Sequence, residues 1–172
     1  MTVRPRPPSV APEVSARLPE AFSAARMGQA EALSDLVRGG VPVDACNDRG
    51  DSLLLLAAYH GHAGTVAALL ACGADPDRLN EAGQSPLAGA AFKGHLDVAR
   101  ALLDGGARVD ARGGDGKTAL LYAAMFNQHA VVRLLLERGA APEHRDDSGM
   151  TALELARGMG SADAAAVLEA AG

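Results

Sequence analysis

The segment that decides the fold is Gly83-Gln84-Ser85-Pro86-Leu87, with Ala90-Ala91 and Gly94-His95 following a few residues later. Gly83 suits a tight turn, because glycine adopts positive φ without steric cost. Ser85 can accept backbone N–H groups at a helix start, and Pro86 loses no hydrogen bond at the first helical position. This order predicts a turn followed by a short alanine-rich helix.

The same signals recur every 33 residues along the chain. Three columns hold the same residue in four successive units: Gly50, Gly83, Gly116 and Gly149; Leu54, Leu87, Leu120 and Leu153; Ala57, Ala90, Ala123 and Ala156. The predicted N-caps are Ser52, Ser85, Thr118 and Thr151, the last with the capping-box spacing to Glu154. A second helix in each unit carries an apolar stripe that includes Leu69, Leu102, Leu135 and Leu168. Neither helix can bury its apolar face alone, so neighbouring units must stack.

With these motifs, and with Gly73-Ala74-Asp75-Pro76-Asp77 closing a unit, the chain resembles the ankyrin repeat family from about Leu18 to Gly172. The resemblance implies an all-α solenoid of stacked helix-turn-helix units joined by short hairpin-like loops. We expect a divergent first repeat over 17–46 and clear repeats over 47–79, 80–112, 113–145 and 146–172. Residues 1–16 contain four prolines and are predicted to form a disordered leader rather than a helix.

Composition excludes several classes of function for the 172 residues. Lys and Arg number 16 against 21 Asp and Glu, a net charge of −5 that argues against a general nucleic-acid binder. No apolar run approaches the roughly 18 residues of a membrane span. Two cysteines, Cys46 and Cys72, are too few for a disulfide framework or a zinc cluster. We therefore expect a monomeric cytoplasmic protein, of bacterial type because Arg greatly outnumbers Lys.

One segment resembles a phosphate-binding loop in relaxed form. It runs from Ala111 to Thr118, and Lys117 would contact the phosphates. Three features argue against that function. No β-branched strand precedes the loop, Asp115 would repel phosphate, and the turn glycine and the cap of the repeat already account for Gly116 and Thr118. We expect Lys117 instead to lie on the protein surface, where its removal costs little stability.

The histidines and carboxylates predict no chemical site either. His60 and His62 flank Gly61 without a third metal ligand nearby, while His62 and His95 occupy positions where a ring caps or packs. No nucleophile and base stand at a spacing typical of catalysis. The sequence therefore predicts no catalytic residue, no metal, no cofactor and no small-molecule substrate.

The candidate binding residues are those that differ between units at columns the fold does not need. In ankyrin-like proteins, the hairpin tips and the exposed end of the first helix line a concave surface that holds partners. The helix candidates are Tyr59, His60, Phe92, Lys93, Met125 and Phe126, and the tip candidates are Arg49, Asp51, Gln84 and Lys117. Large, stiff side chains favour binding hot spots, although these rings could instead only pack. We assign Phe22 and Tyr122 to packing, with Tyr122 filling space beside Gly89.

The tips lean acidic, which predicts a partner with a basic or mixed patch. The resulting hypothesis is a non-catalytic module that binds an unknown protein partner through the concave groove and the tips. An alternative is an accessory or inhibitory subunit that docks on a partner enzyme and changes its activity. A third alternative, an enzyme, would need a deep pocket with perturbed titratable groups.

Overall fold

The computed structural model describes residues 11–172, and this part of the chain is all helical, without a β-sheet. The helices are α1 (Pro12–Ser15), α2 (Leu18–Met27), α3 (Ala30–Arg38), α4 (Leu53–Tyr59), α5 (Ala63–Ala71), α6 (Pro86–Lys93), α7 (Leu96–Asp104), α8 (Ala119–Met125), α9 (His129–Glu137), α10 (Ala152–Met159) and α11 (Ala162–Ala171). The predicted fold class is confirmed. The expectation for the leader is wrong at its end, where Pro12 opens the helical turn α1 from its first position. Residues 1–10 lie outside the described part.

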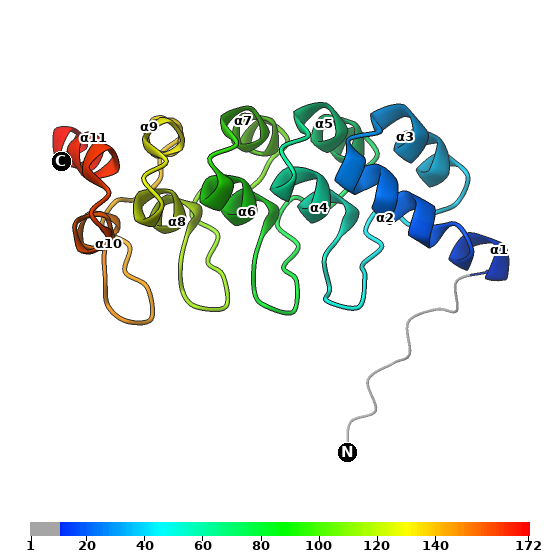
Figure 1. Ribbon diagram of the computed structural model, residues 1–172, viewed down its shortest axis with the longest axis horizontal. Coiled ribbons are helices and arrows are strands. Elements are labelled where there is room, and N and C mark those ends of the chain that lie inside the picture. The colour runs from blue at the N-terminus through cyan, green and yellow to red at the C-terminus, as the bar shows by residue number, and fades with distance from the viewer. Residues whose placement is uncertain (1–10) are drawn as a thin grey trace, which may run out of the picture.

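The helices form two parallel rows with hairpin loops below them (Figure 1). The inner row contains α2, α4, α6, α8 and α10, and the outer row contains α3, α5, α7, α9 and α11. Each helix of the two rows packs against the other helix of its own unit and against its counterparts in the adjacent units. The tips project from the inner row, so inner helices and tips together bound one side of the solenoid.

Three of the four predicted N-caps make the expected hydrogen bonds. The Leu55 N–H donates to Ser52 Oγ over 3.1 Å, and the Ala88 N–H donates to Ser85 Oγ over 3.1 Å. Thr151 and Glu154 form the complete capping box. The prediction is wrong at Thr118, whose Oγ1 is buried and has no partner.

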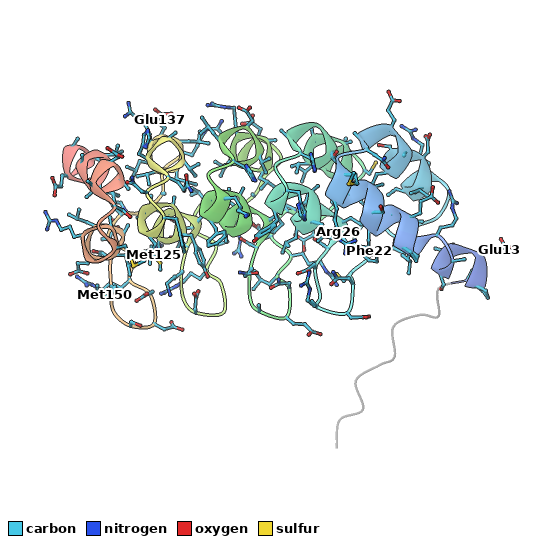
Figure 2. The ribbon with its side chains drawn as sticks, in the orientation of Figure 1. Glu13, Phe22, Arg26, Met125, Glu137 and Met150 are labelled. Carbon is cyan, nitrogen blue, oxygen red and sulfur yellow. The ribbon has the colours of Figure 1, made fainter. Side chains whose placement is uncertain are left out.

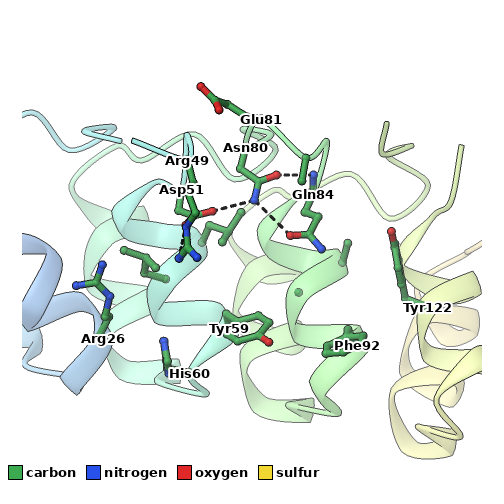
Figure 3. Close-up of a pocket in the computed structure, with 15 residues that line it drawn as sticks. Arg26, Arg49, Asp51, Tyr59, His60, Asn80, Glu81, Gln84, Phe92 and Tyr122 are labelled. Carbon is green, nitrogen blue, oxygen red and sulfur yellow. Dashed lines mark hydrogen bonds and ion pairs between the residues drawn. The ribbon is translucent and has the colours of Figure 1, made fainter. Parts of the chain in front are cut away.

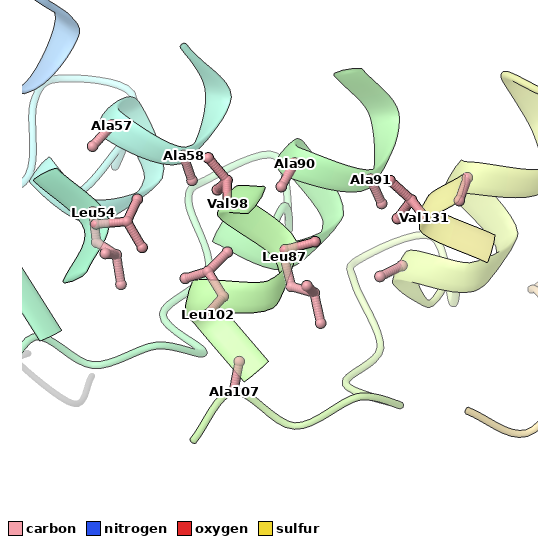
Figure 4. Close-up of a cluster of buried hydrophobic side chains, with 14 of the residues drawn as sticks. Leu54, Ala57, Ala58, Leu87, Ala90, Ala91, Val98, Leu102, Ala107 and Val131 are labelled. Atoms are coloured by element: carbon pink, nitrogen blue, oxygen red, sulfur yellow. The ribbon is translucent and has the colours of Figure 1, made fainter. Parts of the chain in front are cut away.

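The repeated apolar columns form the core between units. The column leucines of α4, α6 and α8 are buried, as are the column alanines from Ala57 to Ala156 (Figure 4). Alanine methyl groups let successive inner helices approach closely, which keeps the interior densely packed. Leu102 and Leu135 of the outer row are also fully buried, as the apolar stripe predicts.

Polar side chains of each unit bind the end of the inner helix of the preceding unit. His62 Nε2 lies 2.8 Å from the Arg26 carbonyl oxygen, and His95 Nε2 lies 3.1 Å from that of Tyr59. Gln128 and Ser161 continue the column by donating to the carbonyls of Phe92 and Met125. These carbonyls would otherwise lack partners at the helix ends. The contacts fix the last turns of the inner helices, and they confirm a capping role for both histidines.

Candidate functional site

A pocket of about 680 Å³ lies between the inner helices and the tips. Its apolar floor comes from Leu55 and Leu56 on α4 and from Ala88 and Gly89 on α6. The walls are Arg26, Arg49, Asp51, Tyr59, His60, Asn80, Glu81, Ala82, Gln84, Phe92 and Tyr122 (Figure 3). We call this pocket, together with the exposed ends of α6 and α8 beside it, the groove.

Gly89 opens the floor of the groove. The other three clear repeats carry Leu56, Tyr122 and Leu155 in the same column, and the divergent first repeat carries Ser23. A Cβ at Gly89 would meet only the Tyr59 ring, at 3.7 Å from Cδ2. The expectation that Tyr122 fills this space is therefore wrong. Its hydroxyl instead donates to Asp115 Oδ2 over 2.8 Å, which holds the ring at the far wall of the pocket.

Aromatic rings from three successive units form a ladder, which consists of Tyr59, Phe92 and Phe126. Tyr59 and Phe92 are stacked with centroids 6.3 Å apart, and Phe126 meets Phe92 edge-on at 4.4 Å. Tyr59 and Phe92 are half-buried, and Phe126 is 40% exposed. The rings thus pack on one another and still present surface to solvent. Met125, at the end of α8, continues the column of Arg26, Tyr59 and Phe92 along the inner row (Figure 2).

Two basic side chains and a histidine lie along the same helix ends. Lys93 Nζ sits 4.8 Å from the centroid of the Tyr59 ring, a cation–π distance. The His60 ring meets Tyr59 edge-on at 5.6 Å. Burial lowers the pKa of His60, and the positive charges of His62, Arg26 and Lys93 lower it further. The lowered pKa favours the neutral form of the His60 ring.

The tip candidate Asp51 joins two tips and is buried. Its carboxylate accepts from Asn80 Nδ2 over 2.8 Å, and from Asn47 Nδ2 and Arg49 Nε over 3.1 Å each. Burial raises the pKa of Asp51, but these hydrogen bonds outweigh burial and hold the pKa below its ordinary value. The Arg49 side chain remains 77% exposed. Gln84, also exposed, accepts a hydrogen bond from Asn80.

Lys117 is not the surface side chain that we expected. It is only 17% exposed, and its Nζ lies 3.1 Å from Asp115 Oδ2 and 3.4 Å from Asp146 Oδ2. Gly113 stands in the column of Asn47 and Asn80, so this tip lacks the side-chain amide that bridges the earlier ones. The ammonium group of Lys117 takes over that bridging role, and it does not line the pocket.

The structure thus brings together six of the ten candidates. Lining the pocket are Arg49, Asp51, Tyr59, His60, Gln84 and Phe92; outside it are Lys93, Met125, Phe126 and Lys117. Sequence reasoning missed Arg26, although it stands one repeat before Tyr59 in the same column. Of the acidic tip residues, Asp51 and Glu81 line the pocket, whereas Asp48, Asp115 and Asp147 do not.

Within residues 11–172, no three His, Cys, Asp or Glu side chains gather in a way that could hold a metal ion. No helix in this described part is both long enough and apolar enough to cross a lipid bilayer. What the groove offers is aromatic surface, an apolar floor and fixed positive charge.

Stacked helix pairs with projecting tips, repeated every 33 residues, define an α-solenoid of repeats. A family model described as ankyrin repeats (3 copies) matches residues 21–113 and 106–171, and the chain belongs to the ankyrin repeat family. Members of this family generally serve protein interaction and not catalysis. A Pseudomonas aeruginosa protein named as an ankyrin repeat protein is 49% identical over 60 residues, which are 35% of this chain and 34% of that protein. The match therefore spans about a third of this relative.

Proposed function

We propose that the chain binds a protein partner in the groove and has no catalytic activity of its own. The observation that carries this proposal is the open pocket of about 680 Å³ beneath the aromatic ladder. Both are built on inner helices whose ends are fixed by the next unit. A rigid site loses little conformational entropy on binding, so its contacts count in full toward affinity.

The candidate residues divide into those that contact the partner and those that position them. Tyr59, Phe92, Met125 and Phe126 provide apolar surface, and His60, Lys93, Arg49 and Gln84 provide polar contacts around it. Asp51 and Lys117 act indirectly, because their carboxylate and ammonium groups hold the tips in place. We place the module in the cytoplasm as a monomer, where its free cysteines Cys46 and Cys72 stay reduced.

The test begins with affinity purification of partners on the full chain and continues with binding isotherms for a purified partner. Tyr59→Ala and Phe92→Ala should each weaken binding by about 2 kcal/mol, as truncated hot-spot rings do. Leu79→Ala is the matched control, because Leu79 is an exposed apolar side chain that does not line the pocket. Unchanged affinity in both ring variants, or a larger loss in the control, would contradict the proposal.

The same partner distinguishes a plain interaction module from an accessory or inhibitory subunit. If the partner is an enzyme, its rate is measured with wild-type chain and with Phe92→Ala at equal concentration. A rate change that depends on the ring would favour the accessory role, and an unchanged rate would favour simple binding.

A further inference from the structure

The charges of the groove are distributed unevenly. Helices α4, α6 and α8 contain no carboxylate, and their one charged side chain is Lys93. Arg26 stands in the last turn of α2, at the same level of the inner row. Among the described residues, neither Arg26 nor Lys93 has an acidic partner within 4 Å. A chain with a net charge of −5 thus keeps two uncompensated cations beside this partly apolar pocket.

The carboxylates that line the pocket do not cancel this charge. Asp51 is buried and paired with Arg49, whose exposed guanidinium retains donors for a ligand. Glu81 is exposed at a tip, on the wall opposite the helix ends. Cations at helix C-termini also favour the helix dipole. Many orientations of the Lys93 side chain would satisfy this preference. The orientation observed places the ammonium group over the ring of Tyr59, which lines the pocket.

Apolar and cationic features lie next to each other in this site. The floor at Gly89 has room for a side chain, and the other three clear repeats have leucine or tyrosine at this position. Tyr59 borders the floor on the α4 side, and Tyr122 borders it on the α8 side. Arg26 and Arg49 line the same pocket at its α2 and α4 end (Figure 3).

We propose that the partner presents an acidic peptide segment with an apolar side chain among its carboxylates, an inference that rests on the function proposed above. The apolar side chain inserts over Gly89, between Tyr59 and Tyr122. The carboxylates face Arg26 and Lys93, and one of them reaches Arg49. Charge complementarity of this kind selects partners and speeds their association.

The experiment selects peptides from a phage library that displays random twelve-residue sequences, with the full wild-type chain as bait. Chains carrying Gly89→Leu serve for counter-selection, because leucine fills the floor as it does at Leu56. Arg26→Glu/Lys93→Glu is a second counter-selection that alters only exposed side chains and does not depend on Gly89→Leu folding. The peptides specific to wild type should be net acidic and contain an aromatic or leucine residue.

One enriched peptide, fluorescently labelled, is then titrated against purified variants. Its Kd should rise at least tenfold with Arg26→Glu/Lys93→Glu, and it should rise with added salt because the contacts are ionic. Arg100→Glu, at an exposed cation on α7 that does not line the pocket, is the control charge reversal and should leave the Kd unchanged. Glu81→Lys removes a negative charge from the opposite wall and should lower the Kd.

Three outcomes would overturn the inference, and they bear differently on the proposed function. Groove-dependent peptides that are neutral or basic would refute the acidic partner and leave groove binding intact. An acidic peptide that binds the double charge reversal as tightly as wild type would do the same. Peptides that bind Gly89→Leu, Tyr59→Ala and wild type equally would refute the acidic partner and the groove together.

Discussion

Two sets of columns run through the same inner helices and have opposite properties. The columns that begin at Leu54 and Ala57 keep one residue type in all four clear repeats, and nearly all their side chains are buried between units. The columns that begin at Arg26 and Met27 change residue in every unit and stay half-buried or exposed. The first set contacts the next copy of the same helix, and the second set faces the groove.

The difference shows which residues determine the stacking of the units and which determine the binding surface. The stack needs the same contact at each interface, so its residues recur and any one unit predicts the others. The groove is assembled from several units, each contributing a different group once. A change in the first set should therefore act on folding, and a change in the second set should act on binding.

The largest effect is expected in the repeated, buried columns. Leu102→Ala and Leu135→Ala should each lower the free energy of unfolding by about 2–5 kcal/mol, because both leave cavities between two neighbouring units. Leu168→Ala should cost less, since the last described unit packs against a neighbour on one side only. Urea denaturation curves give all three values, and the reverse order would show that the core is centred elsewhere.

Lys117 stands in a tip column that also changes residue from unit to unit, but we expect it to act on folding rather than on binding. Lys117→Met should lower the free energy of unfolding by about 1–3 kcal/mol, because it leaves the buried Asp146 carboxylate without its cation. The matched control is Arg100→Met, an exposed cation on α7, which should change stability by less than about 0.5 kcal/mol. Equal melting curves for the two variants would show that Lys117 contributes no more to stability than an exposed cation does.

The same tip network predicts a dependence on acid. Hydrogen bonds from the Met150 backbone, and then from Lys117, hold the pKa of Asp146 below its ordinary value of 3.8. A lowered folded-state pKa stabilises the protein above the unfolded-state value, and this stabilisation is lost as the pH falls through the folded-state pKa. The stability difference between wild type and Asp146→Asn should therefore shrink below about pH 4. A difference that stays constant down to pH 2 would contradict the ion pair.

The titration of the Tyr122 hydroxyl reports on the Asp115 part of this network at alkaline pH. Burial, and then the hydrogen bond to Asp115, raise the pKa of Tyr122 from 10.0 to about 12. A raised pKa means that the stabilisation is complete below the unfolded-state value of 10.0 and is lost as the pH rises toward 12. Asp115→Asn should lower the pKa without returning it to 10.0, because burial is the larger cause. Ultraviolet absorbance of the phenolate measures this directly, and Tyr122→Phe identifies its signal.

The fold could be predicted from the sequence because its motifs recur in four clear repeats. Four copies of each column identify the turns, the caps and the buried faces even where one copy deviates, as at Thr118. The groove appears once, and several of its contacts cross unit boundaries. The pairing of Asn80 with Asp51, and of Lys117 with Asp146, depends on which residue the neighbouring unit presents. Column position alone identified Tyr59, Phe92 and Phe126 as candidates. It placed Met125, and not Phe126, in the column of Tyr59 and Phe92, and it could not show that Lys117 turns inward.

The smallest expected effect is at Gly89, in the floor of the groove, where the other units carry a larger residue. Gly89→Ala should raise the free energy of unfolding by about 0.5–1 kcal/mol, since alanine favours the interior of α6 over glycine. The added Cβ would lie 3.7 Å from the Tyr59 ring, an ordinary contact that strains nothing. Gly83→Ala is the opposing control: Gly83 has φ of 73°, and a Cβ there would collide with the Gly114 backbone, so this variant should be destabilised. Thermal melts compare the two. A destabilised Gly89→Ala would mean that the floor of the groove is already filled, and the pocket would then lose its role as the site where a partner side chain inserts.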